Sequence, residues 1–385
     1  MKRLKHSFIF LILVCCVLHV SGLAIATEDP YDEHLLEHVL VADEVLDEFS
    51  YLNLSVLFDY WQSKMPESLA AMYAASWEKP LLPYVAMTAA SNHFRAWLGD
   101  ADAVMQTSGL DLFAVRQIVE VGAVGRQQVW LGGKLDTELI KKMLTDLDYS
   151  EMDKSDETLT LLAFKGSLDD QHTDCPRHGV PFFGGKLGRC QPVLLADYVV
   201  ATTRHAKSFE TLLTDDKQML SENESVSKML ALFQEEDYEI AQMTWYAEER
   251  VSSLLRRDGA VTLMAMPQAA AIADLYKEKA HRVLLVFTFE DDARAEHAAL
   301  RLNERLPGTM LHYLDLSLTD TLEALNGQIT GVESRENAVL IMFDFEYSED
   351  IDEMPADVRA FADLHKYLAL QMLDWHDLLS DADES

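Results

Sequence analysis

The richest stretch of chemical side chains is HTDCPRHGVPFFGGKLGRC, residues 172–190, which holds two cysteines, two histidines, four glycines and a lysine. Cys175 and Cys190 are candidates for a disulfide that would constrain this glycine-rich loop. Closing such a loop stabilises a fold by about 3 kcal/mol through the entropy lost by the unfolded chain. Zinc is the alternative, because His172, Cys175, His178 and Cys190 carry suitable ligand atoms, although their spacing matches no standard zinc knuckle.

Phosphate binding and thiol redox chemistry fit the same stretch less well. From Gly179 to Lys186 the loop is one residue too long for the G-x-x-x-x-G-K pattern, and Leu187 stands where Ser or Thr would hold magnesium. The two cysteines also lack the close C-x-x-C spacing that favours a reactive redox pair. We therefore interpret residues 172–190 as a surface loop closed by a Cys175–Cys190 disulfide.

A second candidate site is His34-Leu35-Leu36-Glu37-His38, in which two histidines are four residues apart. On a helix this spacing places both imidazoles on one face, with Glu37 beside them. The five residues match H-x-x-E-H and so resemble the signature of the inverzincin metalloproteases. The resemblance implies zinc held by His34 and His38, with Glu37 as the base and a downstream carboxylate, for which Glu120 is the candidate, as the third ligand.

The same five residues also fit the solvated face of an acidic amphipathic helix, because seven Asp and Glu residues crowd positions 32–48. The family's zinc helix follows strands that build its site. If residues 1–26 are removed as a signal, as predicted below, only the stretch TEDPYDE precedes the motif, and it leaves no room for a strand.

The first 26 residues have the layout of a secretory signal. Three basic residues precede an apolar run at 8–20, and Ala24-Ile25-Ala26 supplies small residues for cleavage. The run is shorter than the roughly 20 residues that span a bilayer. We therefore predict export to the periplasm or the extracellular space, where thiols oxidise. Lipid modification of Cys15 or Cys16 is a minor alternative.

Acidic residues dominate the charge, since 65 Asp and Glu stand against 32 Lys and Arg, a formal net charge of −33. Removing the predicted signal takes three basic residues and no acidic one, which leaves 29 against 65, or −36. A protein must bring positive charge to displace phosphate counterions, so this charge disfavours nucleic acid and anionic membrane surfaces as partners. A saline habitat, simple solubility and weak divalent-cation binding are all compatible with the acidity.

The apolar periodicity predicts an α+β fold with two sheet-and-helix units, flanked by an N-terminal helical segment and a long C-terminal helix. The expected parts are a signal peptide (1–26), an N-terminal helical segment (27–98), a first α+β domain (99–236) with the disulfide loop (172–190), a second α+β domain (237–350), and a C-terminal helix with an acidic tail (351–385). A loose internal duplication is one interpretation, because LDTELIKKMLTDL and DDARAEHAALRLNERL are both helical and each follows a strand.

Individual elements follow from the same periodicities. We predict helices at 32–49, 111–121 and 267–279, and strands at QQVWLGG, YEIAQMTWYA, HRVLLVFTF and NAVLIMFDFEY. Residues 355–380 are predicted to form one helix. Its apolar stripe consists of Val358, Phe361, Leu364, Leu368, Met372, Trp375 and Leu379.

No complete catalytic constellation emerges from the sequence. It has no G-x-S-x-G elbow, no G-x-G-x-x-G after a strand, and no calcium-loop layout in its acidic stretches. We therefore expect a non-enzymatic exported envelope protein that acts as an interaction or scaffold module, without a cofactor, for an unknown protein partner or envelope component. The alternative is a zinc-dependent peptidase that uses His34, His38 and a distant glutamate.

Overall fold

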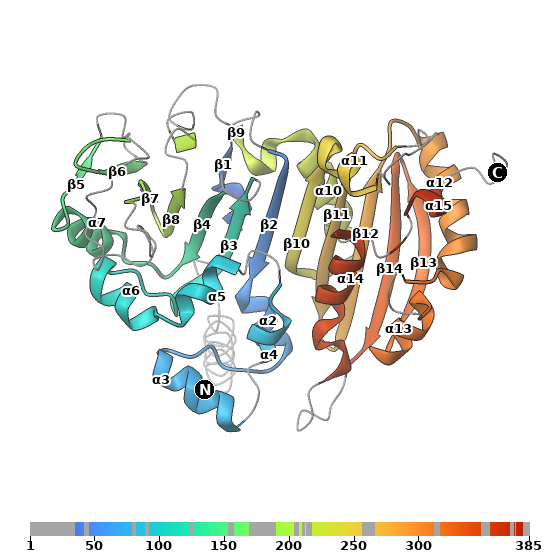
Figure 1. The fold of residues 1–385 in the computed structure, drawn as a ribbon, viewed down its shortest axis with the longest axis horizontal. Coiled ribbons are helices and arrows are strands. Elements are labelled where there is room, and N and C mark those ends of the chain that lie inside the picture. Colours follow the sequence, from blue (N-terminus) through green and yellow to red (C-terminus); the bar gives the residue numbers. More distant parts are fainter. Residues whose placement is uncertain are drawn as a thin grey trace, which may run out of the picture. The chain divides into compact units, whose positions relative to one another are not determined.

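One antiparallel sheet of twelve strands runs through the described part of the chain (Figure 1). The computed structural model describes residues 35–41, 46–78, 82–88, 92–122, 127–152, 158–168, 190–203, 208–209, 212, 218–255, 266–311, 316–347, 355–369, 373 and 375–379. All of them belong to one unit, Leu35–Ser385, and the other unit, Met1–His34, lies outside the described residues. The chain has an α+β fold, as the sequence predicts.

The sheet divides into two halves that meet at its centre. Its strand order is β13 (Gly327–Arg335), β14 (Ala338–Glu346), β12 (Ala280–Thr288), β11 (Ala269–Lys277), β10 (Glu239–Ala247), β2 (Glu48–Asn53), β3 (Val115–Val121), β4 (Gln128–Gly133), β8 (Val199–Thr203), β7 (Val193–Ala196), β6 (Thr160–Phe164) and β5 (Tyr149–Glu151). We call β2 to β8 the first half and β10 to β14 the second half. A separate two-stranded sheet pairs β1 (Leu40–Val41) with β9 (Gln218–Met219).

The five inner strands of the first half are connected like the five strands of the second half, whereas β5 and β6 at the outer edge of the first half have no counterpart, and the internal duplication stays a prediction. In the first half β2 pairs with β3, β3 with β4, and the chain returns after α7 (Thr137–Thr145) to pair β8 with β4 and β7 with β8. In the second half β10, β11, β12, α12 (Asp292–Arg305), β14 and β13 repeat these relations. Antiparallel pairing of β2 with β10 joins the halves, so both predicted α+β units contribute to one sheet.

Two layers of helices cover one face of the sheet, which we call the helical face. The first layer packs on the first half, and the second layer packs on the second half. The first layer consists of α2 (Leu54–Tyr60), α3 (Leu69–Glu78), α4 (Leu82–Ala86), α5 (Asn92–Leu98), α6 (Ala101–Ser108) and α7. The second layer consists of α11 (Glu248–Leu255), α12, η4 (Leu306–Gly308), α13 (Leu318–Ala324), η5 (Ala356–Arg359), α14 (Ala360–Ala369) and α15 (Trp375–Leu379).

Polar residues start several of these helices where the sequence predicts a start. The Asp136 side chain accepts from the backbone N–H of Leu139 at the beginning of α7, and Asp291 does the same for Arg294 at the beginning of α12. Such caps satisfy amide groups that have no partner within the first helical turn. Both helices of the predicted duplication therefore begin with the same local device.

The opposite face of the sheet has its own apolar core, covered by η1 (Leu35–Glu37), η3 (Leu220–Glu222) and α10 (Glu224–Gln234). Side chains alternate between the two faces along each strand. Tyr51 and Val119 therefore face this core, whereas Leu52 and Ile118 face the first helical layer. Apolar strand residues are buried on both faces, so the strands appear as nearly continuous apolar runs in the sequence.

The predicted helix at 32–49 is wrong in the part that the structure describes. Leu35–Glu37 form a short 3₁₀ turn, Leu40–Val41 form β1, and Glu48 begins the central strand β2. Leu35, Leu36 and Val39 are buried against the opposite face, so tertiary packing decides the conformation of this segment. Helices do follow from α2 onward, as expected for the rest of residues 27–98.

Two further predicted helices are strands. Residues 115–121 form β3, and residues 269–277 form β11. Alanine-rich text such as AAAIAD favours a helix locally, but β11 lies between two strands and is buried along almost its whole length. The alanine side chains of β11 are buried because one face of the strand packs against the second helical layer and the other face packs in the core of the opposite face.

The long C-terminal helix is also wrong. Within the described residues this region contains η5, α14 and α15, with α14 ending at Ala369 and α15 starting at Trp375. Val358, Phe361, Leu364, Trp375 and Leu379 from the predicted stripe are buried, as an apolar stripe requires. The stripe therefore marks core residues correctly, although shorter helices present them.

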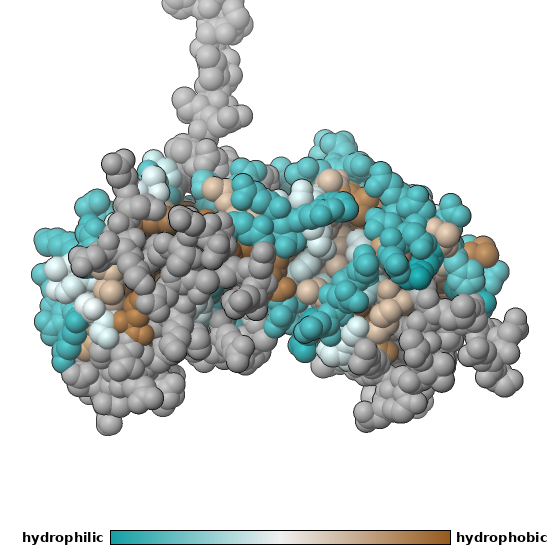
Figure 2. Space-filling view, turned by 90° about the horizontal axis from the view of Figure 1, so that it is seen from above, coloured by the Kyte–Doolittle hydropathy of each residue, from teal (hydrophilic) through white to brown (hydrophobic). Residues whose placement is uncertain are grey.

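Hydrophilic residues make up most of the described surface in Figure 2, with apolar residues in small separate groups. The large apolar side chains most exposed in the described residues are Leu300, Met310 and Tyr73. Isolated exposed apolar residues are normal on a folded protein.

Candidate functional site

A buried group of polar side chains lies on the helical face, where the two helical layers meet. We call it the seam cluster, and each member is exposed by 5% or less. Gln242 on β10 faces Asp274 on β11, and Tyr276 on β11 faces His281 on β12. Buried polar residues of this kind require partners, so their bonds indicate what the cluster does. Its members are Tyr60, Gln242, Asp274, Tyr276, His281 and Asp357.

Asp357 reaches the cluster from η5, which bridges both helical layers. The next residue, Val358, packs in the core of the first layer, and Ala360 packs in the core of the second. The Asp357 side chain is therefore buried where the backbone passes from the core of the first helical layer to the core of the second. Its carboxylate is 1% exposed.

His281 is held between two carboxylates. Its Nε2 lies 2.7 Å from Asp274 Oδ1, and its Nδ1 lies 3.2 Å from Asp357 Oδ2. Burial by itself would lower the pKa of His281, but the charges and hydrogen bonds of Asp274 and Asp357 outweigh it and raise the pKa to about 9. The imidazole is therefore charged at neutral pH and donates a hydrogen bond from each nitrogen.

Gln242 connects the cluster to α4 of the first helical layer. Its Nε2 donates to Asp274 Oδ2 at 2.7 Å and to the carbonyl of Ala86 at 3.1 Å, and its Oε1 accepts from the backbone N–H of Thr88 at 2.6 Å. The hydroxyl of Tyr276 donates to the same Asp274 oxygen at 3.2 Å. Both oxygens of Asp274 are thus satisfied by groups from β10, β11 and β12.

Aromatic rings enclose the imidazole. Tyr276 stacks on His281 with ring centroids 4.5 Å apart, and Tyr60 of α2 lies 4.1 Å from Tyr276. Burial and then the charge of Asp357 raise the pKa of Tyr60 above its ordinary range. The Tyr60 hydroxyl and Asp357 Oδ1 make no hydrogen bond within the described part of the chain.

The seam cluster is built to hold elements together and is poorly suited to acid–base catalysis. A general base needs a free nitrogen within reach of a substrate, and both nitrogens of His281 are already bonded to carboxylates. A catalytic triad has a hydroxyl or thiol in place of the second carboxylate. The arrangement instead ties α2, α4 and η5 to three adjoining strands.

A second polar group lies along the same seam, toward the start of β2. The Tyr246 hydroxyl and His365 Nε2 are 2.9 Å apart, and Arg250 donates to Glu48 at 2.8 Å. Burial, and then the charge of Lys366, lower the pKa of His365 to about 4. His365 is therefore neutral at pH 7, in contrast to His281.

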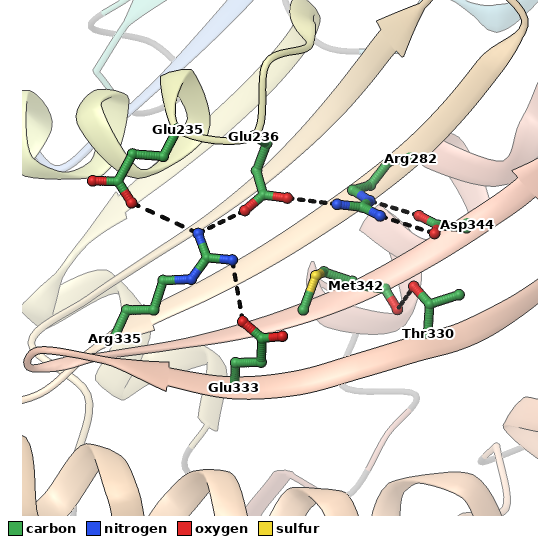
Figure 3. Close-up of polar contacts among 8 residues, drawn as sticks. All are labelled: Glu235, Glu236, Arg282, Thr330, Glu333, Arg335, Met342 and Asp344. Carbon is green, nitrogen blue, oxygen red and sulfur yellow. Dashed lines mark hydrogen bonds and ion pairs between the residues drawn. The ribbon is translucent and has the colours of Figure 1, made fainter.

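An ionic network on the opposite face of the second half links the end of α10 to β12, β13 and β14 (Figure 3). Arg282 binds both oxygens of Asp344, at 2.6 and 2.9 Å, and also Glu236. Arg335 binds Glu236 at 2.7 Å and Glu333 at 3.1 Å. Glu236 thus bridges two arginines, and every partner in this network is a side chain of the chain itself.

The zinc ligand set suggested by the H-x-x-E-H motif is not brought together. His34 lies outside the described residues, and Leu35–Glu37 form a 3₁₀ turn in place of the α-helix that the motif needs. Glu120 lies on strand β3 between Val119 and Val121, which both face the core beneath η1. Because side chains alternate along a strand, Glu120 points to the other face of the sheet.

The predicted disulfide loop lies largely outside the described residues. Cys175, His172 and His178 belong to that part, whereas Cys190 is described and packs partly buried against the first helical layer. Next to it, the carbonyl of Gln191 accepts a hydrogen bond from the hydroxyl of Tyr149 at 3.1 Å. The Cys175–Cys190 pairing stays a prediction, as do the signal peptide at 1–26 and the lipid alternative at Cys16.

Neither a metal centre nor a membrane span is found in the described ranges. No group of three or more His, Cys, Asp or Glu side chains in them is arranged to hold a metal ion. No helix among those residues has the length and apolar composition to cross a bilayer.

Comparisons with known proteins add no family. No protein-family model matches the chain, and none of the curated proteins matches it. Among solved structures, crystal forms I, III and IV of TP0453, from Treponema, share 7–8% identity with it at TM-scores of 0.31–0.34. They cover 83–84% of this chain and 92–94% of their own. Similarity at this level carries no argument about fold or function.

The sequence analysis did not identify the seam cluster. One signal was available, because Asp274 is a lone charge in the apolar run AAAIADLY, and a buried charge requires a partner. His281 starts an apolar strand and Asp357 lies in acidic sequence, so neither stands out. Only the pairing of β11 with β12 and the approach of η5 bring the three together.

Proposed function

We propose that this chain is a non-enzymatic exported protein of a bacterial envelope that serves as an interaction or scaffold module. The observation that carries the proposal is the state of His281, whose two nitrogens are both bonded to carboxylates in a closed core. The seam cluster thus holds strands and helices of the described chain together and offers no free nitrogen of His281 to a substrate. Export is supported by the predicted signal at 1–26 and the predicted disulfide, and the charge of −36 suits a solvent-facing exported protein.

Export is tested by expressing the whole chain in a bacterial host and determining the mature N-terminus by mass spectrometry. We expect a chain that begins at Thr27 and lies outside the cytoplasm. Non-reducing peptide maps should link Cys175 to Cys190. A chain retained in the cytoplasm with its first residues intact would refute this part of the proposal.

The interaction role is tested by photo-crosslinking in cells, with a crosslinking amino acid placed at one exposed position at a time. Leu300 and Met310 sample the second half, and Tyr73 and Met105 sample the first. A scaffold with a defined interface gives a discrete crosslinked adduct with a partner protein from some positions and none from the others. The same adduct should form when the purified chain is mixed with the purified partner. No adduct at any position, or equal smears at all four, argues against a defined interface.

Catalysis is tested separately by metal analysis and peptide-cleavage assays of the purified mature chain. We expect no stoichiometric zinc and no cleavage that depends on His38. One zinc per chain that is lost in His38→Ala would support the peptidase alternative instead.

A further inference from the structure

The C-terminal helical segment, which we define as residues 355–369, 373 and 375–379, packs in the second helical layer. Phe361, Leu364, Trp375 and Leu379 pack in the core of that layer, and the ring of Trp375 lies 5.2 Å from that of Phe287. Asp357, close to the start of the segment, supplies its ionic contact with the sheet through His281. The position of the segment therefore combines apolar packing with one buried ionic bond.

The two bonds of His281 are unequal. The Nε2 contact with Asp274 is 2.7 Å and the Nδ1 contact with Asp357 is 3.2 Å. Asp274 belongs to the neighbouring strand and is also bonded by Gln242 and Tyr276. Asp357 has one oxygen on His281 and the other without a hydrogen bond within the described residues. The bond to the C-terminal segment is thus the weaker of the two.

We propose that His281 is a proton-dependent latch, which holds the C-terminal helical segment on the sheet when its imidazole carries two protons and releases the segment when it carries one. A neutral imidazole has a single N–H, and the shorter bond to Asp274 keeps that proton on Nε2. The lone pair of Nδ1 then faces the Asp357 carboxylate. A buried carboxylate without a donor is costly, and leaving the core restores its hydration.

The groups around His281 do not replace the lost proton. Asp274 and Tyr276 of β11, Asp357 of η5 and Tyr60 of α2 are acidic or neutral. Phe345 of β14 contacts the ring, and Gln242 of β10 reaches it through Asp274. The nearby cations contact other groups, since Lys279 lies over the ring of Tyr347 and Arg282 binds Asp344 at the opposite face. Deprotonation of His281 therefore leaves two carboxylates without a buried cation between them.

The direction of the pH effect follows from the pKa of His281, which is raised from 6.5 to about 9. The contribution of the latch is complete below pH 6.5 and is lost as the pH rises through about 9. Release is therefore an alkaline event. Burial raises the pKa of Tyr276 and Tyr60 well above 9, so these neighbours remain neutral in that window.

The test is ¹⁹F NMR of the whole chain labelled with 5-fluorotryptophan, titrated from pH 6 to 10.5. Trp375 reports on the segment and Trp130, buried in the first half, serves as the internal control, with Trp375→Phe and Trp130→Phe assigning the two signals. We expect the Trp375 signal to change with a midpoint near pH 9 while the Trp130 signal stays constant. A simultaneous change of both signals means global unfolding and overturns the latch.

Two variants separate the latch from general alkaline sensitivity. Asp357→Asn keeps the shape and accepts from Nδ1–H but removes one carboxylate that stabilises the proton, so the midpoint should fall by about one pH unit or more. His365→Gln lies in the same segment away from the cluster and should leave the midpoint unchanged. A midpoint that does not respond to Asp357→Asn, or a Trp375 signal that is constant to pH 10.5, overturns the proposal.

Discussion

The two halves of the sheet share the order of their inner five strands but have different interiors. The first half is packed on its helical face mainly by apolar side chains, such as Ile118 and Leu131, and also carries the buried Glu120 on this face. The second half carries buried charges on the same face, Asp274 and His281, and the Arg282–Asp344 pair on the other. The shared topology therefore does not require a shared core chemistry. Hydrogen bonds from Gln242 and His281 of the second half reach the end of α4 and η5, so directional polar contacts join the helical layers at this junction.

The largest difference between the halves should appear when the seam cluster is broken. Asp274→Ala removes the principal partner of His281 and leaves a buried imidazolium with a single weaker bond. Breaking a buried ion pair in this way costs about 3–5 kcal/mol of unfolding free energy. Urea denaturation followed by circular dichroism measures it. Glu224→Ala, in an exposed pair with Lys228, is the matched control and should leave the midpoint unchanged.

Equivalent cavities in the two halves test whether the sheet unfolds as one unit. Leu131 on β4 and Leu285 on β12 occupy corresponding strands and are buried under their own helical layers. Each change to Ala should cost about 2–5 kcal/mol. Because β2 and β10 join the halves, we expect one transition that shifts as a whole for either variant, followed by Trp130 and Trp375 fluorescence. If each variant lowers only the transition of its own half, the halves are independent domains.

The two seam histidines should show opposite pH dependence. The pKa of His365 is lowered from 6.5 to about 4, so the native state binds fewer protons than the unfolded chain in this window. Its contribution is therefore lost as the pH falls from 6.5 toward 4, by about 2 kcal/mol for a group of this burial. Thermal unfolding of wild type and His365→Gln at pH 7 and pH 4.5 measures the difference. Equal pH slopes in both proteins would contradict a neutral, half-buried His365.

The smallest effects are expected in the ionic network of Figure 3. Arg282→Gln loses a two-bond contact with Asp344 and should cost about 1–2 kcal/mol. Arg335→Gln affects a more exposed arginine and should cost less than about 1 kcal/mol. Added salt should reduce the second cost more than the first. Denaturant midpoints at low and high salt check this order, and equal costs would mean that Arg282 gains nothing from its paired bonds.

Patterns that depend on one element were predictable from the sequence. Two helices and two strands occur where the apolar periodicity predicts them. The helices start after Asp136 and Asp291, and the strands are QQVWLGG and HRVLLVFTF. The two helices were also the signal for the duplication. Local capping and apolar period decide these elements, and both can be read along the chain.

Elements whose conformation depends on distant partners were not predictable. Residues 269–277 have helix-compatible composition but become a strand because neighbours on both sides take up their backbone groups. The composition of residues 115–121, VRQIVEV, is rich in β-branched residues and itself favours the observed strand, so this helix prediction overlooked a local signal. The seam cluster also depends on distant partners, since Asp274, His281 and Asp357 are dispersed in the sequence. The zinc hypothesis failed for a related reason. The four-residue spacing of His34 and His38 suits zinc binding on an α-helix, but Leu35–Glu37 form a 3₁₀ turn.

The antiparallel joint between β2 and β10 also constrains the order in which the protein can be assembled. Ser50 and Thr244, which face each other across it, are 194 residues apart. As the chain emerges from its N-terminus, one edge of β2 stays unpaired until β10 has also emerged. Contacts this remote in sequence close slowly, and an unpaired edge invites association with other chains. The middle of the sheet is therefore completed late, and a chain that stops emerging before residue 239 leaves one edge of β2 open to association.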